Sequence, residues 1–337
     1  MVSSRPFGLV NGKTVTAYTI ENKTHTRLTV IDYGARIASL ILTDGREVVL
    51  GFDSAEGYAQ DNASIGAVCG RYANRISNAC FTLNGIEYML DKNDGQNTLH
   101  GGKDGFAYRM FTAKTEENAV ILTFVSPDGD MGFPGELTLT VRYDLTENAL
   151  RIKYSAQSNR DTVINITNHT YFNLAGCGRI FDHKLRVNAH LYTPSDEELM
   201  PTGEFLDVTG TPLDLRENVR LGDWLDPLDP FLEEHLGYDN SYVVDRKERD
   251  VLEYAATLTA PDGLMMDCFT TEPCIHIYTA NYLNDDNGRG GMKYEPLTAV
   301  CLETQHFPDA MKHPHFPSPI LRTGNTYFSE TEYRFHY

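Results

Sequence analysis

Apolar and polar residues alternate with a period of two along much of the chain. In residues 137–146, leucine, valine and tyrosine alternate with threonine, arginine and aspartate. This is the pattern of a β-strand with one buried face. The alternation continues over 150–156, recurs over 120–124, and flanks Asn84–Gly85, a two-residue hairpin signal. The pattern therefore predicts many short strands joined by tight turns.

Helical signals are few and short. Asp53 is a candidate cap for a brief turn through Tyr58, and Asp229–Pro230 precedes a second short candidate over Phe231–Leu236. The regular strand spacing instead favours an all-β fold, a large antiparallel β-sandwich or barrel with few short helices. The chain contains no internal repeat and no low-complexity linker, so residues 1–337 are expected to form a single domain.

The chain is strongly acidic, with 47 Asp and Glu against 29 Lys and Arg and a formal net charge of −18. Such a charge repels nucleic acid and anionic membranes and disfavours a heavily phosphorylated substrate, but it allows a neutral small molecule. The sequence shows neither an apolar leader nor an apolar run approaching the ~20 residues of a membrane helix. The six cysteines form no CxxC pair, which is typical of reduced thiols. We expect a soluble cytoplasmic protein.

His169 lies in the sequence NITNHTYFNLAG, residues 165–176. The β-branched residues upstream, over 163–166, predict a buried strand that ends close to His169, and the aromatic pair Tyr171–Phe172 follows. A titratable side chain at a strand end between aromatic residues is a candidate proton donor. The alternative is a core histidine whose ring nitrogens are held by backbone groups.

Glu303 lies in VCLETQHFPD, residues 300–309. In a strand, Val300 and Leu302 point to one face while Cys301 and Glu303 point to the other, so an acid is embedded in a largely apolar strand. Burial without a partner raises a carboxyl pKa toward the range that is useful to a general base. The alternative is a surface carboxylate on the wet face of an edge strand, which the preceding apolar run disfavours.

Four further residues carry candidate side chains. Arg71 and Arg75 in GRYANRI, residues 70–76, can hold a substrate hydroxyl or carboxylate or can pair with acids of the protein. His100 precedes two glycines, which suits either a closely approached ligand or a turn that needs glycine. Asp239 precedes a predicted strand and is a candidate ligand for sugar hydroxyls or a turn aspartate.

The chain has no GxSxG elbow, P-loop or dinucleotide-binding glycine motif, so the candidates indicate acid/base chemistry without a nucleophile or a cofactor. Four residues near the C-terminal end could in principle bind a metal, but the spacing of these residues fits no standard ligand pattern, and no metal is expected. The four residues are His306, Asp309, His313 and His315. Glycoside hydrolysis would need a second buried acid beside Glu303, to which the sequence does not point.

Taken together, these segments resemble the aldose 1-epimerases, or mutarotases, of the galactose mutarotase type. The shared motifs are GRYANRI, LHGG, SPDGDMGFPGELTL (126–139), TNHTYFNLAG, LYTPSDEELMPTGEF (191–205), GYDNSYV, ETQHFPDA and HPHFPSPILRTG (313–324). The resemblance implies a β-sandwich of the galactose-mutarotase type. It also implies cofactor-free interconversion of the α and β anomers of a free aldose such as glucose or galactose, in an open cleft.

The resemblance also assigns roles to residues. Glu303 matches the general base and His169 the general acid. The implied substrate-binding residues are Asn74, Arg75, His100, Asp239 and His276.

Two positions depart from the family pattern. His276, in HIYTAN, stands where the family motif QFYTGN has glutamine, and GYDNS replaces the usual GYDHN, with Asn240 and Ser241 after the aspartate. These departures concern sugar preference and leave the acid/base pair intact.

Two rival functions remain open at this point. One is a non-catalytic carbohydrate-binding protein on the same scaffold, and the other is a hexose-6-phosphate 1-epimerase. The second requires additional cations for the phosphate, and the acidic balance offers no obvious cluster. The expected partner is a monosaccharide, with no nucleic acid or membrane, and the expected oligomeric state is a monomer or a homodimer.

Overall fold

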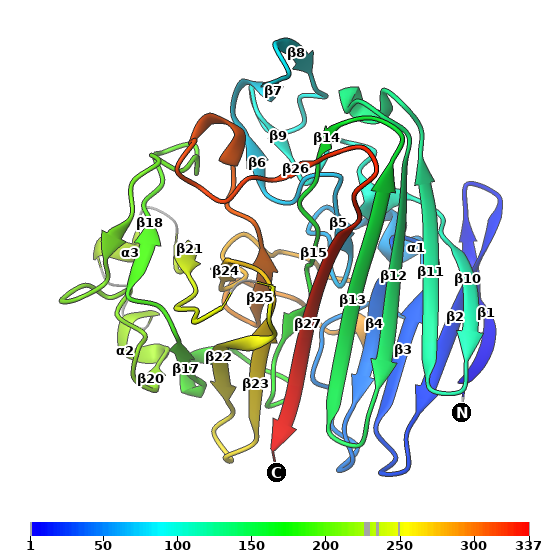
Figure 1. The fold of residues 1–337 in the computed structure, drawn as a ribbon. Coiled ribbons are helices and arrows are strands. Elements are labelled where there is room, and N and C mark those ends of the chain that lie inside the picture. The colour runs from blue at the N-terminus through cyan, green and yellow to red at the C-terminus, as the bar shows by residue number, and fades with distance from the viewer. Residues whose placement is uncertain (1, 226–229, 234–235, 249, 337) are drawn as a thin grey trace.

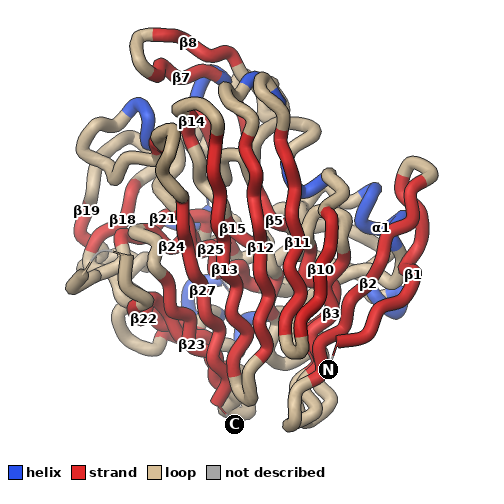
Figure 2. The backbone as a smooth tube through the Cα atoms, turned by 45° about the vertical axis from the view of Figure 1, so that its right-hand side comes forward, coloured by secondary structure: helices blue, strands red, loops and turns tan. Residues whose placement is uncertain are grey.

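The computed structural model describes residues 2–225, 230–233, 236–248 and 250–336, and it is built mainly of β-strands (Figures 1 and 2). Within these residues the larger sheets have four, nine and six strands, here called the N-terminal sheet, the long sheet and the short sheet. The N-terminal sheet has the order β1 (Val2–Val10), β2 (Lys13–Glu21), β3 (Arg27–Ile31) and β4 (Arg36–Ile41).

The long sheet and the short sheet contain most of the remaining strands. The long sheet has the order β10 (Thr112–Glu116), β11 (Ala119–Ser126), β12 (Leu137–Leu145), β13 (Ala149–Ser158), β27 (Tyr327–His336), β23 (Met265–Thr270), β22 (Glu253–Thr259), β17 (Lys184–Val187) and β20 (Val219–Arg220). The short sheet has the order β16 (Tyr171–Phe172), β25 (Val300–Gln305), β24 (Cys274–Tyr278), β21 (Asp239–Val243), β18 (Leu191–Thr193) and β19 (Leu206–Asp207).

Short strand pairs and short helices complete the described chain. The pairs are β14 (Thr162–Val163) with β26 (Ile320–Leu321), β15 (Thr167–Asn168) with β5 (Val68–Cys69), β6 (Arg75–Ile76) with β9 (Thr98–Leu99), and β7 (Cys80–Leu83) with β8 (Ile86–Met89). The α-helices are α1 (Ala55–Gln60), α2 (Gly222–Leu225) and α3 (Pro230–Glu233). Single 3₁₀ turns are η1 (Ser77–Ala79), η2 (Phe106–Tyr108), η3 (Asp130–Gly132), η4 (Ile180–Asp182), η5 (Arg289–Gly291) and η6 (Ala310–Lys312).

The two-residue periodicity in the sequence corresponds to the long sheet. In β12 every second side chain, from Leu137 to Leu145, is buried, and β13 repeats the pattern. Figure 2 shows β27, β13, β12 and β11 side by side. The expectation of an all-β antiparallel sandwich with few short helices is confirmed.

The long sheet packs on one face of the short sheet. The Tyr333 hydroxyl of β27 donates to the Leu302 carbonyl of β25 at 2.9 Å, and the rings of Phe172 and Tyr333 lie 4.9 Å apart. Val300 and Leu302 belong to the main core cluster, which also takes side chains from the N-terminal sheet. Because neighbouring residues of a strand point to opposite faces, Cys301 and Glu303 face away from this core.

One predicted strand is broken in two. The residues over 163–166 are buried, as expected, but they do not form one continuous strand. β14 and β15 pair with different partners, and Asn165 between them binds distant segments. Its amide donates to the Ala73 and His306 carbonyls at 3.0 and 3.2 Å, which draws the backbone away from a regular ladder.

Two predicted helix starts are also adjusted. Ser54, not Asp53, caps α1, because its hydroxyl accepts the Gly57 amide, whereas the Asp53 carboxylate accepts the amide of Gly290. Pro230 is the first residue of α3, as predicted. The proposed cap at Asp229 lies outside the described residues.

The hairpin at Asn84–Gly85 forms with both residues at positive φ, 53° and 77°. Phe81 and Leu83 are buried, and Tyr88 of β8 packs against them, but Ile86 is 53% exposed, so the prediction of one buried face fails at Ile86. The hairpin projects at the top of Figure 1, with Ile86 beside its turn.

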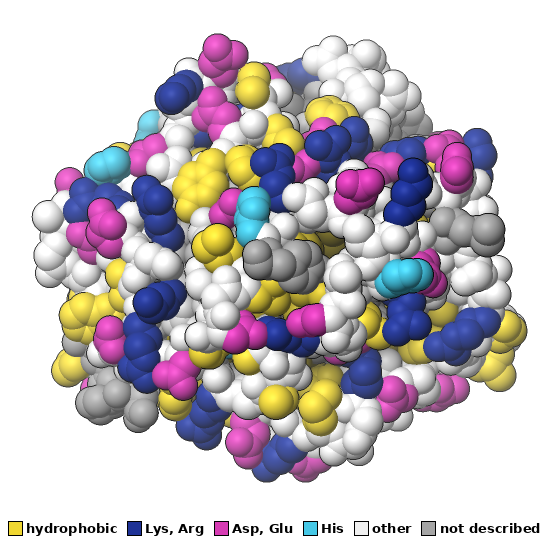
Figure 3. Space-filling view, turned by 90° about the horizontal axis from the view of Figure 1, so that it is seen from below, with side chains coloured by type: hydrophobic (Ala, Val, Ile, Leu, Met, Phe, Trp, Pro, Cys, Tyr) yellow, Lys and Arg dark blue, Asp and Glu magenta, His cyan; other side chains and the backbone are white. Residues whose placement is uncertain are grey.

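The surface carries side chains of both charges. On the face seen in Figure 3, cationic and acidic side chains are interspersed. No helix in the described ranges is long and apolar enough to span a bilayer.

Candidate active site

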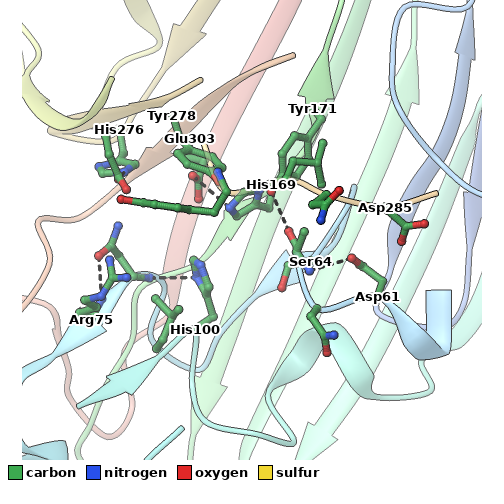
Figure 4. Close-up of a pocket in the computed structure, with 18 of the residues that line it drawn as sticks. Asp61, Ser64, Arg75, His100, His169, Tyr171, His276, Tyr278, Asp285 and Glu303 are labelled. Carbon is green, nitrogen blue, oxygen red and sulfur yellow. Dashed lines mark hydrogen bonds and ion pairs between the residues drawn. The ribbon is translucent and has the colours of Figure 1, made fainter. Parts of the chain in front are cut away.

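A cleft of about 350 Å³ opens on the short sheet, on the face turned away from the main core. The cleft is lined by every catalytic and substrate-binding residue that the resemblance implies: Asn74, Arg75, His100, His169, Asp239, His276 and Glu303. Figure 4 shows His169, His276 and Glu303 directed into the same space as Arg75 and His100. Side chains from positions more than 200 residues apart thus meet in one cavity.

The strand register arranges the floor of the cleft in two rows. Ser241 of β21 is paired with His276 of β24, and His276 with Glu303 of β25. Two residues earlier on β21, Asp239 begins a second row that continues through Tyr278 and Cys301 to Tyr171. Alternate residues of a strand share a face, so both rows lie on the cleft side of the short sheet, where Asp239, Tyr171, His276, Tyr278 and Glu303 line the cleft.

His169 and Glu303 form the most buried polar pair of this floor. His169 Nε2 lies 3.4 Å from Glu303 Oε1, and the residues are 5% and 1% exposed. The backbone of His169 is fixed on both sides, since its amide donates to Ala67 and its carbonyl accepts from Gly66. Glu303 Oε2 is buried and has no hydrogen-bond partner among the described residues. The pair is therefore held in place with one carboxylate oxygen unsatisfied.

A thiol and aromatic rings surround the imidazole of His169. Its Nδ1 lies 3.5 Å from Cys301 Sγ, and its ring stacks on Tyr171 with centroids 5.0 Å apart. Tyr278 and His100 meet it edge-on at 5.9 and 5.3 Å. Burial, together with the nearby Glu303 carboxylate, raises the pKa of the Cys301 thiol well above its ordinary value. The thiol is thus a neutral neighbour, and the wall of rings excludes water from one side of the pair.

Asn74 and His100, beside His169, are joined by two hydrogen bonds. The His100 amide donates to the Asn74 carbonyl at 3.1 Å, and the Asn74 amide donates to His100 Nδ1 at 3.2 Å. The pKa of His100 is held well below its ordinary value, chiefly by burial. The charges of the neighbouring His169, Arg75 and His276 lower it further. His100 is therefore neutral, and because Nδ1 accepts, its proton sits on Nε2 as a hydrogen-bond donor.

Gly101 supports the turn interpretation of LHGG. Its φ is +87°, and a Cβ there would lie 2.1 Å from the Gly70 carbonyl oxygen. The turn requires glycine, and it places His100 on the cleft wall.

The two arginines of GRYANRI lie in different environments. Arg75 lines the cleft and its Nε donates to Asp94 at 2.7 Å. Arg71 is 2% exposed and its guanidinium donates to Ser126 and the Pro134 carbonyl, while burial lowers its pKa to about 10. Arg71 is a structural residue that holds neighbouring loops.

This cleft has the residue set implied by the resemblance, and the comparison with known proteins agrees. A family model described as aldose 1-epimerase matches residues 16–334. The chain belongs to the aldose 1-epimerase family.

Similar proteins cover nearly the whole of this family member. Galactose mutarotase of Bos taurus is 41% identical over 92% of the chain and 91% of the relative. Aldose 1-epimerase of Escherichia coli K12 is 35% identical over 99% of both chains. The crystal structure of an aldose epimerase homologue from C. elegans superposes with a TM-score of 0.88 at 30% identity, covering 95% of this chain and 98% of that one. The aldose 1-epimerase family makes this protein an isomerase.

The four residues of the metal alternative do not converge in this aldose 1-epimerase family member. His306 binds Glu272, Asp309 binds Ser77, and His315 contacts the Gly203 carbonyl. In the part of the chain that the structure describes, no group of three or more His, Cys, Asp or Glu is placed to hold a metal ion.

Other cleft residues were not predicted. Tyr278, Leu99 and the loops over 60–64 and 282–285 complete the lining. Tyr278 could have been found, because it lies two residues after His276 and shares its face of the strand. The loops carry no periodic signal, so only the folded chain places them.

Proposed function

We propose that this protein interconverts the α and β anomers of a free aldose, with Glu303 as general base and His169 as general acid. The observation that carries the proposal is their contact at 3.4 Å beneath a wall of aromatic rings, where Glu303 Oε2 is buried and unsatisfied. A buried carboxylate oxygen that faces a cavity without a partner is ready to accept a proton or a hydrogen bond from a substrate.

The reaction needs only two proton transfers. Glu303 takes the proton of the C1 hydroxyl while His169 donates a proton to the ring oxygen, and the C1–ring oxygen bond breaks to give the open-chain aldehyde. Rotation about C1–C2 presents the other face of the carbonyl. Ring closure returns both protons to their starting groups with the roles reversed. Each positioned group contributes about 10²–10⁴-fold.

The remaining cleft residues suit a neutral, hydroxyl-rich substrate. His100 offers an Nε2 proton, Asn74 offers amide groups, and Asp239 and Arg75 offer charged hydrogen-bond partners. A cavity of about 350 Å³ has room for one pyranose ring and bound water. Because relatives carry the name galactose mutarotase, galactose and glucose are the first sugars to test.

The charges of the cleft disfavour the sugar-phosphate alternative. Of its described lining residues, Arg75 is the only lysine or arginine, and it is already paired with Asp94. Four carboxylates line the same space: Asp61, Asp239, Asp285 and Glu303. A phosphate dianion would meet repulsion that one paired arginine does not offset. The unsatisfied base likewise weighs against a protein that binds sugar without turnover.

Polarimetry of freshly dissolved α-galactose and α-glucose tests the proposal. The wild-type protein should accelerate the approach to the anomeric equilibrium, glucose 6-phosphate should be a much poorer substrate, and kcat/KM should fall at both acid and alkaline pH because base and acid need opposite protonation states. If wild type bound galactose in a calorimeter but left the rotation rate at that of buffer, the epimerase proposal would be wrong and the binding alternative correct.

We also propose that residues 1–337 act as one domain in the cytoplasm, as a monomer or homodimer. The main core cluster draws on the N-terminal, long and short sheets, which supports a single unit. All six cysteines are free thiols in the described chain, which suits a reducing compartment. Gel filtration with light scattering measures the oligomeric state, and a single cooperative unfolding transition would support one domain.

A further inference from the structure

His276 is held at both ring nitrogens by strand β21. Its Nε2 lies 2.8 Å from Asp239 Oδ1, and its Nδ1 lies 2.9 Å from Ser241 Oγ. All three residues are buried, with exposures of 6%, 8% and 4% for His276, Asp239 and Ser241. Asp239 and Ser241 are two residues apart on one face of the strand, so the imidazole spans the gap between them.

The chemistry of the three groups fixes the direction of both hydrogen bonds. An ionised carboxylate only accepts, so Nε2 of His276 carries a proton and donates to Asp239. In the neutral ring Nδ1 is then an acceptor, and the Ser241 hydroxyl donates to it. If the ring gains a second proton, Nδ1 donates to Ser241 instead. In either state the protein uses both polar atoms of the ring.

We propose that His276 is a positioning residue, anchored by Ser241, which fixes the Asp239 carboxylate for the hydroxyl groups of the sugar. His276 then lines the cleft without being a polar ligand of the substrate. The inference rests on the proposed function in one respect, since it takes Asp239 to be a substrate-binding residue. It assigns Ser241, at which the sequence departs from the family motif, to the recognition of the sugar.

The strand register explains why the anchor is needed. His276 is the direct cross-strand partner of Glu303 as well as of Ser241, so its ring lies between two carboxylates of the cleft, Glu303 on β25 and Asp239 on β21. Ser241 holds Nδ1 and thereby keeps Nε2 turned to Asp239. The two departures from the family motifs, His276 and Ser241, are therefore one hydrogen-bonded unit.

Substitution of the anchor tests the proposal. Ser241→Ala removes the donor to Nδ1 and should raise KM for galactose about three- to tenfold, the effect of one buried hydrogen bond, with kcat changed less than about twofold. Ser241→Thr keeps the hydroxyl and should leave KM at the wild-type value. A small space lined by Thr193 and Leu199 beside Ser241 can take the additional methyl group. Ser155→Ala, on β13 and outside the cleft, is the matched control. An unchanged KM in Ser241→Ala would overturn the inference.

A double-mutant cycle asks whether Ser241 acts through His276. In a His276→Gln background, Ser241→Ala should have little further effect on KM, because the ring that it anchors is gone. If the two changes instead multiply, each residue acts on the sugar independently and the proposal is wrong. Unfolding by urea confirms that each variant is folded before kinetics are compared.

The tautomer of His276 gives a second measurement that needs no substitution in the cleft. Nitrogen-15 NMR of wild-type protein should show the Nε2-protonated ring, and saturating galactose should leave it so. A move of the proton to Nδ1 on galactose binding would show that the ring turns from Asp239 to the sugar and would contradict the proposal. If wild type shows no epimerase activity, the dissociation constant for galactose, measured by calorimetry, replaces KM, so the two hypotheses fail separately.

Discussion

Two buried histidine–glutamate pairs lie next to each other in this protein, and they differ in how completely they are satisfied. His169 and Glu303 meet at 3.4 Å on the floor of the cleft. His306 follows three residues after Glu303 in the chain and meets Glu272 at 2.6 Å outside the cleft. Both glutamates are almost fully buried, at 1% and 2% exposure. Burial and a histidine neighbour are therefore common to both pairs.

The difference lies in the other atoms of each pair. In the second pair, Glu272 Oε1 accepts from the Tyr327 hydroxyl at 2.8 Å, and the His306 amide donates to Asn165 at 2.8 Å. In the first pair, Glu303 Oε2 has no partner among the described residues. A satisfied pair stabilises the fold, whereas an unsatisfied atom facing a cavity is available to a substrate. What marks the catalytic candidate is the missing partner.

In the second pair, each partner shifts the pKa of the other. Burial alone would lower the pKa of His306, but the Glu272 carboxylate outweighs it and the pKa is raised. Burial alone would raise the pKa of Glu272, but the charge of His306 and the hydrogen bonds from His306 and Tyr327 lower it. Each partner thus favours the charged form of the other, which is the behaviour of a structural ion pair.

The largest expected difference between the pairs is in turnover. Glu303→Gln keeps the shape of the side chain and removes the base, so the mutarotation rate should fall about 10²–10⁴-fold in polarimetry. Glu272→Gln, the matched change in the other pair, should leave kcat within about threefold once the variant is folded. Full activity in Glu303→Gln would refute the assignment of the base.

The free energy of unfolding should depend more on the second pair than on the first. Glu272→Ala leaves His306 without its partner and should lower the free energy of unfolding by about 3–5 kcal/mol, measured by urea denaturation. Glu303→Gln should leave it unchanged or slightly raised, because a buried carboxylate with an unsatisfied oxygen is replaced by a neutral amide. Equal losses in the two variants would remove the distinction between a structural pair and a functional one.

The pH dependence of stability tests the charges of the second pair. The contribution of His306, whose pKa is raised above 6.5, is fully present below pH 6.5 and is lost as the pH rises through the raised value. The contribution of Glu272, whose pKa is lowered below 4.5, is present above pH 4.5 and is lost as the pH falls. The stability difference between wild type and Glu272→Gln should therefore peak between pH 4.5 and 6.5. A flat difference would show that the pair is not ionised.

The smallest expected effect comes from the hydroxyl that completes the second pair. Tyr327→Phe removes the hydrogen bond to Glu272 and should cost about 1–2 kcal/mol of unfolding free energy, with unchanged polarimetric rate. A loss of activity larger than the loss of stability would mean that the second pair communicates with the cleft.

The sequence predicted those features that depend on local periodicity. Alternation placed the long strands, and the same rule put Glu303 on the opposite face from Val300 and Leu302. The family resemblance then named the residues that line the cleft. Neither argument revealed Glu272, because its segment Thr270–Pro273 has the composition of an exposed turn and its partner His306 lies 34 residues later.

Long-range contacts account for the predictions that failed. The strand over 163–166 breaks because Asn165 binds one carbonyl group 92 residues before it and another 141 residues after it. Arg71 and Arg75 share one motif, but only the distant Ser126 and Pro134 determine that Arg71 is structural. Placing His306 in a metal site was open on ligand type alone, and its true partner became visible only in the fold.

The two rows on the floor of the cleft separate the proposed base from residues that can be varied. Position 303 carries the proposed base, while Ser241 and His276 occupy the neighbouring cross-strand positions of the same row. Substituting these two residues together should change the sugar preference while the positions of Glu303 and His169 are kept. A one-residue insertion within β25 would instead turn Glu303 toward the core and erase the whole pattern. We therefore expect substitutions at positions 241 and 276 to alter the substrate range, and an insertion in β25 before Glu303 to abolish the proposed chemistry.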